Sequence, residues 1–90
     1  MLQIKYKNIF EKDIARVKKR GKNIEKLKEV IRLLAEESPL PPKFRDHPLI
    51  GNYKDRRECH IESNWLLIYK KEMNTIIFER TGTHSDLFNS

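Results

Sequence analysis

The chain is 90 residues long, carries a formal charge of +6, and is 38% hydrophobic and 36% charged. This length supports one small core, because chains divide into separate domains only beyond about 250 residues. We therefore expect a single domain over residues 1–90. Apolar residues are spread along the whole chain, which argues against disorder. No apolar run reaches the ~20 residues that span a bilayer, and charged residues interrupt the N-terminus where a secretory signal would need an apolar stretch.

Cysteine content points to a cytoplasmic protein. The single cysteine, Cys59, excludes an internal disulfide and a multi-cysteine metal cluster, which fits a reducing compartment. Its alternating apolar surroundings predict a small core residue rather than a catalytic nucleophile.

Basic residues are concentrated in the first third of the chain. Residues 1–35 hold eleven Lys and Arg but only four Asp and Glu, whereas residues 36–90 are almost balanced. Excess positive charge favours a polyanionic partner such as RNA. A charge run is also typical of an ordinary solvated helix. The first interpretation predicts a docking surface for phosphate.

The N-terminal half predicts a strand followed by two helices. Apolar and polar residues alternate over 2–7, as in a half-buried strand. A helix capped by Asn8 is expected to end near Gly21, and a second helix to run from Asn23 until Pro39 stops it. The break at Gly21 folds the two helices back on each other as a hairpin. Four cations lie at its turn: Lys18, Lys19, Arg20 and Lys22.

The second half predicts a loop and three strands. Residues 38–55 carry all four prolines, so we expect an ordered loop or extended segment. Alternation over 57–61 and apolar runs over 65–71 and 75–81 indicate a three-stranded antiparallel meander, to which the N-terminal strand can add. The order β-α-α-β-β-β predicts a small α+β domain, in which a two-helix hairpin packs on one face of an antiparallel sheet. The other face is expected to stay open.

Three histidines are the residues best suited to proton transfer. His47 lies in the loop, His60 in a strand and His84 in the C-terminal tail, so the fold can bring all three to one end or face of the sheet. Histidine can act as acid or base near neutral pH. RNA cleavage needs a base for the 2′-hydroxyl proton and an acid for the leaving 5′-oxygen. A three-histidine zinc site is the alternative, which the absence of i,i+3 or i,i+4 spacing disfavours.

Arginines and aromatic rings in the same segments suit an RNA substrate. Arg57 and Arg80 lie at corresponding stages of two strands, where bidentate hydrogen bonds could hold a phosphate. Ordinary ion pairs are the alternative role for both. The rings of Trp65, Tyr53 and Phe88 could stack on bases, and core packing is the alternative for Trp65 and Phe88.

Two blocks of the chain resemble the YafQ branch of the RelE superfamily of toxins. They are HPLIGNYKDRRECHIESNWLLIY at 47–69 and ERTGTHSDLF at 79–88. They match the family's His-Pro-Leu, Arg-acid-x-His and Arg-x-Gly-x-His segments, while residues 1–46 match by pattern alone. The resemblance implies a type II toxin that enters the ribosomal A site and cuts mRNA there. It also implies a cognate antitoxin that holds the toxin inactive. We expect no metal or other cofactor in the reaction.

The resemblance also carries the family's site onto positions of this chain. The expected catalytic residues are His47, His60, His84, Arg80 and Glu58, and the expected substrate-binding residues are Arg57, Asn64, Trp65 and Phe88. We expect His84 and His60 to form the proton-transfer pair, with His47 as an additional acid or orienting group. Arg57 and Arg80 would stabilise the transition state. Which histidine is the acid and which the base is left open.

One position departs from the family pattern. The family reads Pro-Asp-Trp where this chain reads Ser63-Asn64-Trp65, so an amide that cannot take a proton replaces a carboxylate. We hypothesise that this residue only orients a neighbour, in which case Asn64 suffices. If the family's Asp acts as a base, Glu58 or Asp86 would have to replace it. The alternative function is a catalytically weakened homologue that binds RNA or antitoxin.

Overall fold

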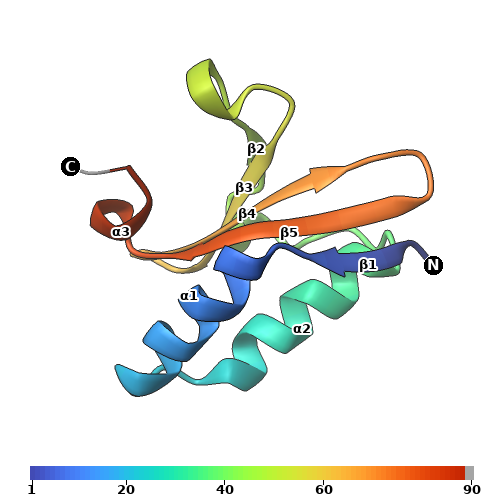
Figure 1. Cartoon of the computed structure of the whole chain (residues 1–90). Coiled ribbons are helices and arrows are strands. Elements are labelled where there is room, and N and C mark those ends of the chain that lie inside the picture. Colours follow the sequence, from blue (N-terminus) through green and yellow to red (C-terminus); the bar gives the residue numbers. More distant parts are fainter. Residues whose placement is uncertain (89–90) are drawn as a thin grey trace.

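The computed structural model describes residues 1–88, which form one five-stranded sheet with two helices beneath it (Figure 1). In chain order the elements are β1 (Gln3–Tyr6), α1 (Asn8–Lys19), α2 (Ile24–Ala35), the 3-10 helix η1 (Pro42–Phe44), β2 (His47–Pro48), the 3-10 helix η2 (Gly51–Tyr53), β3 (Arg57–Glu62), β4 (Trp65–Lys71), β5 (Thr75–Gly82) and α3 (His84–Phe88). The strand order in the sheet is β1-β5-β4-β3-β2. None of the described helices is both long and apolar enough to cross a membrane.

The predicted α+β class and helical hairpin are confirmed, and the sheet differs from expectation in its pairing. Strands β3, β4 and β5 form the antiparallel meander. β1 joins β5 in parallel, so the sheet is mixed rather than antiparallel. Parallel neighbours need a long crossover between them, which α1 and α2 begin. The segment 38–55 also contains the short edge strand β2, where a proline is tolerated because no further strand needs its missing N–H.

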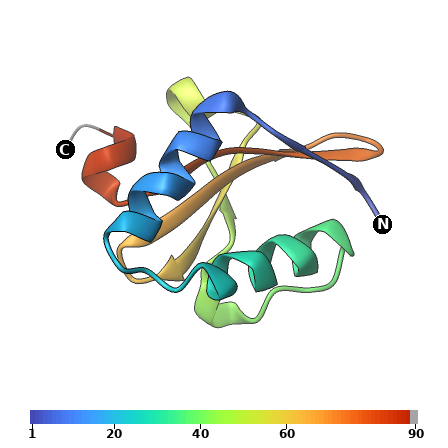
Figure 2. The ribbon, with the colours of Figure 1, turned by 60° about the horizontal axis from the view of Figure 1, so that its bottom comes forward.

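The two helices lie on the same side of the sheet (Figure 2). α1 begins at Asn8 itself, with Lys7 in the cap position and no side-chain cap, so the expected Asn8 cap is wrong. Asn23 caps α2 as predicted, because its side chain accepts a hydrogen bond from the Glu25 N–H at 3.0 Å. Gly21 has φ of +85° in the turn between the helices, a left-handed conformation that glycine adopts without strain.

Apolar clusters lie on both faces of the sheet. The larger one fills the space between the helices and the sheet and includes Phe10, Leu27, Trp65 and Phe78. The smaller one, on the other face, is formed by Leu66, Ile68 and Leu87, with Leu49 and Tyr53 packed against it. The face that was expected to be open is therefore partly covered by α3 and by the segment around η2. β4 is buried on both sides, which explains its unbroken apolar run.

Candidate active site

Strand β3 presents two candidate catalytic residues on the sheet face opposite the helices. Successive side chains of a strand point to opposite faces, and Cys59 and Ile61 pack in the helix-side core. Glu58 and His60 therefore point to the other face. His47 of β2 pairs in register with Glu58 and reaches the same face. The sheet itself thus brings these three side chains together.

Helix α3 adds the third histidine to this face. The ring centroids of His47 and His60 are 6.1 Å apart, and those of His60 and His84 are 6.0 Å apart. We call these three residues the histidine row. Phe88 extends the row at the His84 end, with its ring centroid 6.3 Å from that of His84 and 36% of its surface exposed. Side chains from β2, β3 and α3 are therefore close enough to act on one substrate.

Glu58 is a buried carboxylate between two members of the histidine row. Its Oε1 lies 3.2 Å from Nε2 of His60 and 3.7 Å from Nε2 of His47, and only 5% of the residue is exposed. Buried charges are costly unless they have a partner. Glu58 is thus placed to accept a hydrogen bond from a protonated Nε2 of His60, while Nε2 of His47 lies within ion-pair distance of it.

Backbone carbonyls fix the other nitrogen of both rings. Nδ1 of His47 lies 2.6 Å from the Arg45 carbonyl oxygen, and Nδ1 of His60 lies 3.3 Å from that of Ser63. A carbonyl oxygen only accepts hydrogen bonds, so both Nδ1 atoms carry a proton. Nε2 is consequently the nitrogen that can exchange a proton on each ring. No residue pattern could have revealed these contacts, because every residue has a carbonyl.

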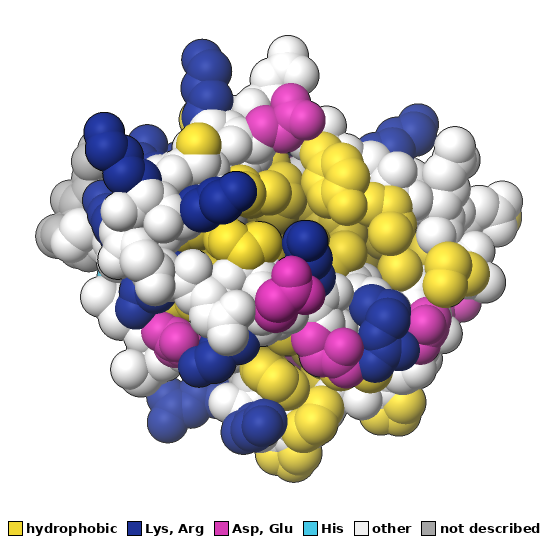
Figure 3. All heavy atoms as spheres, turned by 90° about the horizontal axis from the view of Figure 1, so that it is seen from below, with side chains coloured by type: hydrophobic (Ala, Val, Ile, Leu, Met, Phe, Trp, Pro, Cys, Tyr) yellow, Lys and Arg dark blue, Asp and Glu magenta, His cyan; other side chains and the backbone are white. Residues whose placement is uncertain are grey.

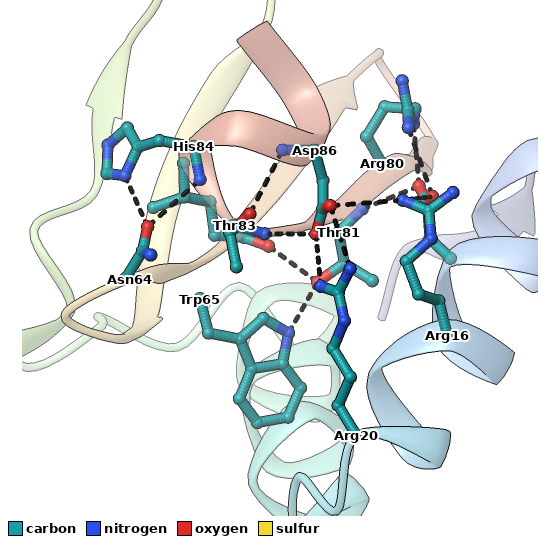
Figure 4. Close-up of polar contacts among 11 residues, drawn as sticks. Arg16, Arg20, Asn64, Trp65, Arg80, Thr81, Thr83, His84 and Asp86 are labelled. Carbon is teal, nitrogen blue, oxygen red and sulfur yellow. Dashed lines mark hydrogen bonds and ion pairs between the residues drawn. The ribbon is translucent and has the colours of Figure 1, made fainter. Parts of the chain in front are cut away.

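Asn64 holds His84 by two hydrogen bonds (Figure 4). Its Oδ1 accepts from the His84 backbone N–H at 3.1 Å and lies 2.8 Å from Nδ1 of the ring. Because a backbone N–H can only donate, the Asn64 atom that faces it must be the oxygen. Nδ1 of His84 then carries the proton, and Nε2 is the unprotonated nitrogen of the neutral ring. This geometry supports the hypothesis that Asn64 orients a neighbour.

The family model described as "Bacterial toxin of type II toxin-antitoxin system, YafQ" matches residues 2–89. The chain belongs to the YafQ toxin family. The mRNA interferase toxin YafQ of Escherichia coli K12 is 44% identical over 86 residues, which cover 94% of both chains. These matches confirm the resemblance found in the sequence.

Solved toxin structures share the fold. The E. coli DinJ-YafQ complex matches with a TM-score of 0.91 and 43% identity, covering 98% of this chain and 99% of the other. A metal-bound toxin from Helicobacter pylori matches with a TM-score of 0.92 and 43% identity, covering 98% and 100%. In residues 1–88 of the present toxin, no group of three His, Cys, Asp or Glu side chains is arranged to hold a metal ion.

Arg80 of this YafQ-family toxin lies on the histidine-row face but apart from the row. The register runs from Glu58 through Ile68 to Arg80, so the Ile68 side chain separates the two charged groups. Nε and Nη2 of Arg80 donate to the Asp13 carboxylate at 2.7 and 3.2 Å. Asp13 is fully buried, and its hydrogen bond raises the pKa of Arg80 above the ordinary value. The structure thus fixes Arg80 through an aspartate that sequence reasoning did not single out.

Two predicted site residues of the toxin lie on the helix side instead. Arg57 points away from the histidine row, and its Nε and Nη2 each donate to Asp46 at 3.3 Å. Trp65 is 1% exposed, and its Nε1–H donates to Thr81 Oγ1 at 2.9 Å. A buried ring cannot stack on a base. Substrate contacts by Arg57 and Trp65 are therefore not supported. Arg57 instead forms an ion pair, and Trp65 packs in the core.

Two further groups take no part in the row. Cys59 is fully buried, and burial raises the pKa of its thiol, so it lacks the thiolate that a nucleophile needs. Asp86, the possible substitute base, bonds Arg20 at 2.6 Å and not a histidine. Glu58 is the carboxylate that the structure places among the histidines.

Proposed function

We propose that this YafQ-family toxin is an endoribonuclease that cuts mRNA on the ribosome in the cytoplasm, without a metal. The observation that carries the proposal is the histidine row. In each of its rings Nδ1 is hydrogen-bonded, which leaves Nε2 as the nitrogen that can gain or lose a proton. General acid/base catalysis needs two such groups within reach of one phosphodiester. The whole chain, residues 1–90, would act as one toxin domain.

The partners of each ring divide the proton roles. Nδ1 of His84 bonds Asn64, and no other described residue bonds its Nε2, so the neutral ring suits the base. His60 has an oxygen acceptor at each nitrogen, which suits a ring that carries two protons and acts as the acid. His47 shares Glu58 with His60 and would orient the acid or supplement it.

The reaction balances with these two residues alone. His84 takes the proton of the 2′-hydroxyl, and the 2′-oxygen attacks phosphorus. The bond from phosphorus to the 5′-oxygen breaks, and His60 gives its proton to that oxygen. The products are a 2′,3′-cyclic phosphate, or the 3′-phosphate formed from it by water, and a free 5′-hydroxyl.

Arg80 and Phe88 would complete the substrate site. Asp13 takes two of the five N–H donors of the Arg80 guanidinium, so donors remain for the phosphate as it becomes pentavalent. The half-exposed ring of Phe88 lies at the end of the histidine row, where a base could stack on it.

The turn between α1 and α2 is proposed to dock on ribosomal RNA. Fewer of its four cations are available for this than the sequence suggests. Seen from the helix side, Lys and Arg side chains are interspersed with Asp and Glu (Figure 3). At the turn, Arg20 and Lys22 form ion pairs with Asp86 and Glu62. Lys18 and Lys19 have no acidic partner within the described residues. Their phosphate contacts would release counterions, so ribosome association should weaken as salt rises.

A cognate antitoxin is the proposed protein partner. The E. coli YafQ structure at 43% identity is a complex with DinJ, and this toxin shares its fold. A partner that covered the histidine row would prevent mRNA from reaching Nε2 of His60 and His84.

Induced expression tests the proposal directly, with wild type and His84→Ala compared by growth and by mapping mRNA 5′ ends. We expect growth arrest and new 5′ ends in the wild type alone. Folded wild-type protein that produces neither would support the weakened homologue instead, and Asn64 would be the first residue to restore. A parallel cleavage reaction with EDTA tests the zinc alternative, since activity that survives the chelator excludes it.

A further inference from the structure

Helix α3 is tied to the end of α1 by an ion pair across the molecule (Figure 4). Arg20 donates from Nη1 and Nη2 to the two carboxylate oxygens of Asp86, at 2.6 and 3.2 Å. Arg16 lies 3.7 Å from the same carboxylate. A helix of five residues has little stability of its own. Its position therefore depends on contacts of this kind.

The Asp86 carboxylate also closes the first turn of α3. Its Oδ2 accepts from the Thr83 N–H at 2.9 Å, and the Asp86 N–H donates to Thr83 Oγ1 at 3.1 Å. This reciprocal pair is the arrangement of a capping box. A Cβ on Gly82 would lie 2.8 Å from Oδ2 of Asp86, so the carboxylate packs directly on the glycine. Asp86 is thereby fixed from three directions.

The same short helix carries His84. Asp86 lies two positions after His84, whose N–H and ring are held by Asn64. Leu87 packs with Leu66 and Ile68 on the sheet. Asp86 itself contacts no member of the histidine row, so any effect it has on the chemistry must pass through α3.

We propose that Asp86, which is ion-paired with Arg16 and Arg20, is a positioning residue that fixes the position of His84 in the histidine row. The proposal rests on the proposed function in that His84 is taken as a catalytic group. An exposed ion pair alone contributes little to stability. The bidentate geometry, the capping contacts and the close packing on Gly82 give this pair a defined geometry that an ordinary surface pair lacks.

Arg20→Ala is the test variant, because it breaks the ion pair without changing any residue of α3. Arg32→Ala is the matched control, since Arg32 is likewise an ion-paired helix arginine, bonded to Glu29 and Glu36, but has no link to α3. Cleavage is measured under single-turnover conditions at saturating toxin, where the rate reports the chemical step and no longer depends on how tightly the toxin docks. We expect the maximal rate to fall about ten- to a hundredfold in Arg20→Ala, because misplacement by about 1 Å costs that much. Arg32→Ala should match the wild type, and Arg20→Lys should recover part of the loss.

A double-mutant cycle distinguishes the ion pair from a direct contact of Arg20 with RNA. If Arg20 acts through Asp86, the double variant Arg20→Ala/Asp86→Asn loses no more activity than the more damaging single variant. Losses that multiply, or an Arg20→Ala rate equal to the wild type, would overturn the proposal.

Backbone ¹⁵N relaxation provides a measurement that does not depend on activity. In Arg20→Ala, order parameters over 84–88 should fall from the ~0.85 of rigid backbone towards ~0.6, while Arg32→Ala stays unchanged. If the wild type proves inactive, the proposed function fails, yet this measurement still decides whether Arg20 and Asp86 hold α3. Order parameters that are the same in Arg20→Ala and wild type would refute the positioning role.

Discussion

Oδ1 of Asn64 accepts two hydrogen bonds from a single residue, His84, through the backbone N–H at 3.1 Å and the ring Nδ1 at 2.8 Å. A carboxylate oxygen could accept the same two bonds. The exchange of aspartate for asparagine at this position therefore preserves the geometry of His84 while removing a negative charge. An orienting residue needs only that geometry, whereas a catalytic base needs the carboxylate that the exchange removes.

This relationship predicts the behaviour of two variants. Asn64→Ala removes both bonds and should lower single-turnover cleavage about ten- to a hundredfold through misplacement of the ring. Asn64→Asp keeps both acceptors and should change the rate by less than about tenfold, or 1.4 kcal/mol in the activation barrier. Rates measured on equal amounts of folded protein check both. A gain above ~100-fold in Asn64→Asp would show that the family's aspartate does more than orient.

His60 and Arg57 lie on opposite faces of β3, so we expect their substitutions to affect the cleavage rate differently. His60→Ala should lower cleavage about 10²- to 10⁴-fold, as for loss of a general acid. Arg57→Ala should keep its rate within about threefold, because Arg57 bonds Asp46 on the helix side and the Tyr69 hydroxyl still bonds that carboxylate. Circular dichroism supplies the folded fraction for each variant. Equal losses in both variants would mean that substrate reaches the helix-side face.

Because the indole of Trp65 is buried, we expect its substitution to lower stability without lowering activity. Trp65→Phe removes the hydrogen bond to Thr81, whose hydroxyl still donates to the Leu66 carbonyl at 2.6 Å. The free energy of unfolding should fall by about 1–2 kcal/mol, with cleavage per folded molecule unchanged. In Phe88→Ala, at a partly exposed ring, the cleavage per folded molecule should fall while the free energy of unfolding changes little. Urea unfolding and cleavage assays on the same samples compare them, and a large loss of activity in Trp65→Phe would argue for substrate contact.

Periodicity explains most of what could be predicted about the site. Strand alternation is enough to place Glu58 and His60 on one face, and the same rule separates Arg57 from them. Grouping Arg57 with Arg80 by their position along two strands overlooks that rule. Trp65 is ambiguous in sequence, since a large aromatic residue suits both a core and a base-stacking surface.

The remaining features depend on contacts between distant segments. β2 has two residues and α3 has five, which is too short for a hydrophobic period to appear. α3 is held by Arg20, 66 positions from Asp86. Asp13 is likewise 67 positions from Arg80. An aspartate within a charged helix looks solvated until the fold brings a partner to it, so sequence spacing could not identify either pair.

Acid should weaken the contribution of Asp86 to stability. The hydrogen bonds from Arg20 and then from Thr83 hold the pKa of the Asp86 carboxyl well below its usual range. A folded-state pKa below the unfolded value of about 3.9 means that the stabilisation is complete above about pH 4 and is lost as pH falls towards the folded value. The difference in unfolding free energy between wild type and Asp86→Asn should therefore shrink when urea unfolding is moved from about pH 6 to about pH 3. In an Arg20→Ala background the same substitution should show a smaller dependence on pH. A difference that stays constant over this range would mean that Asp86 is not held more tightly in its ionised form.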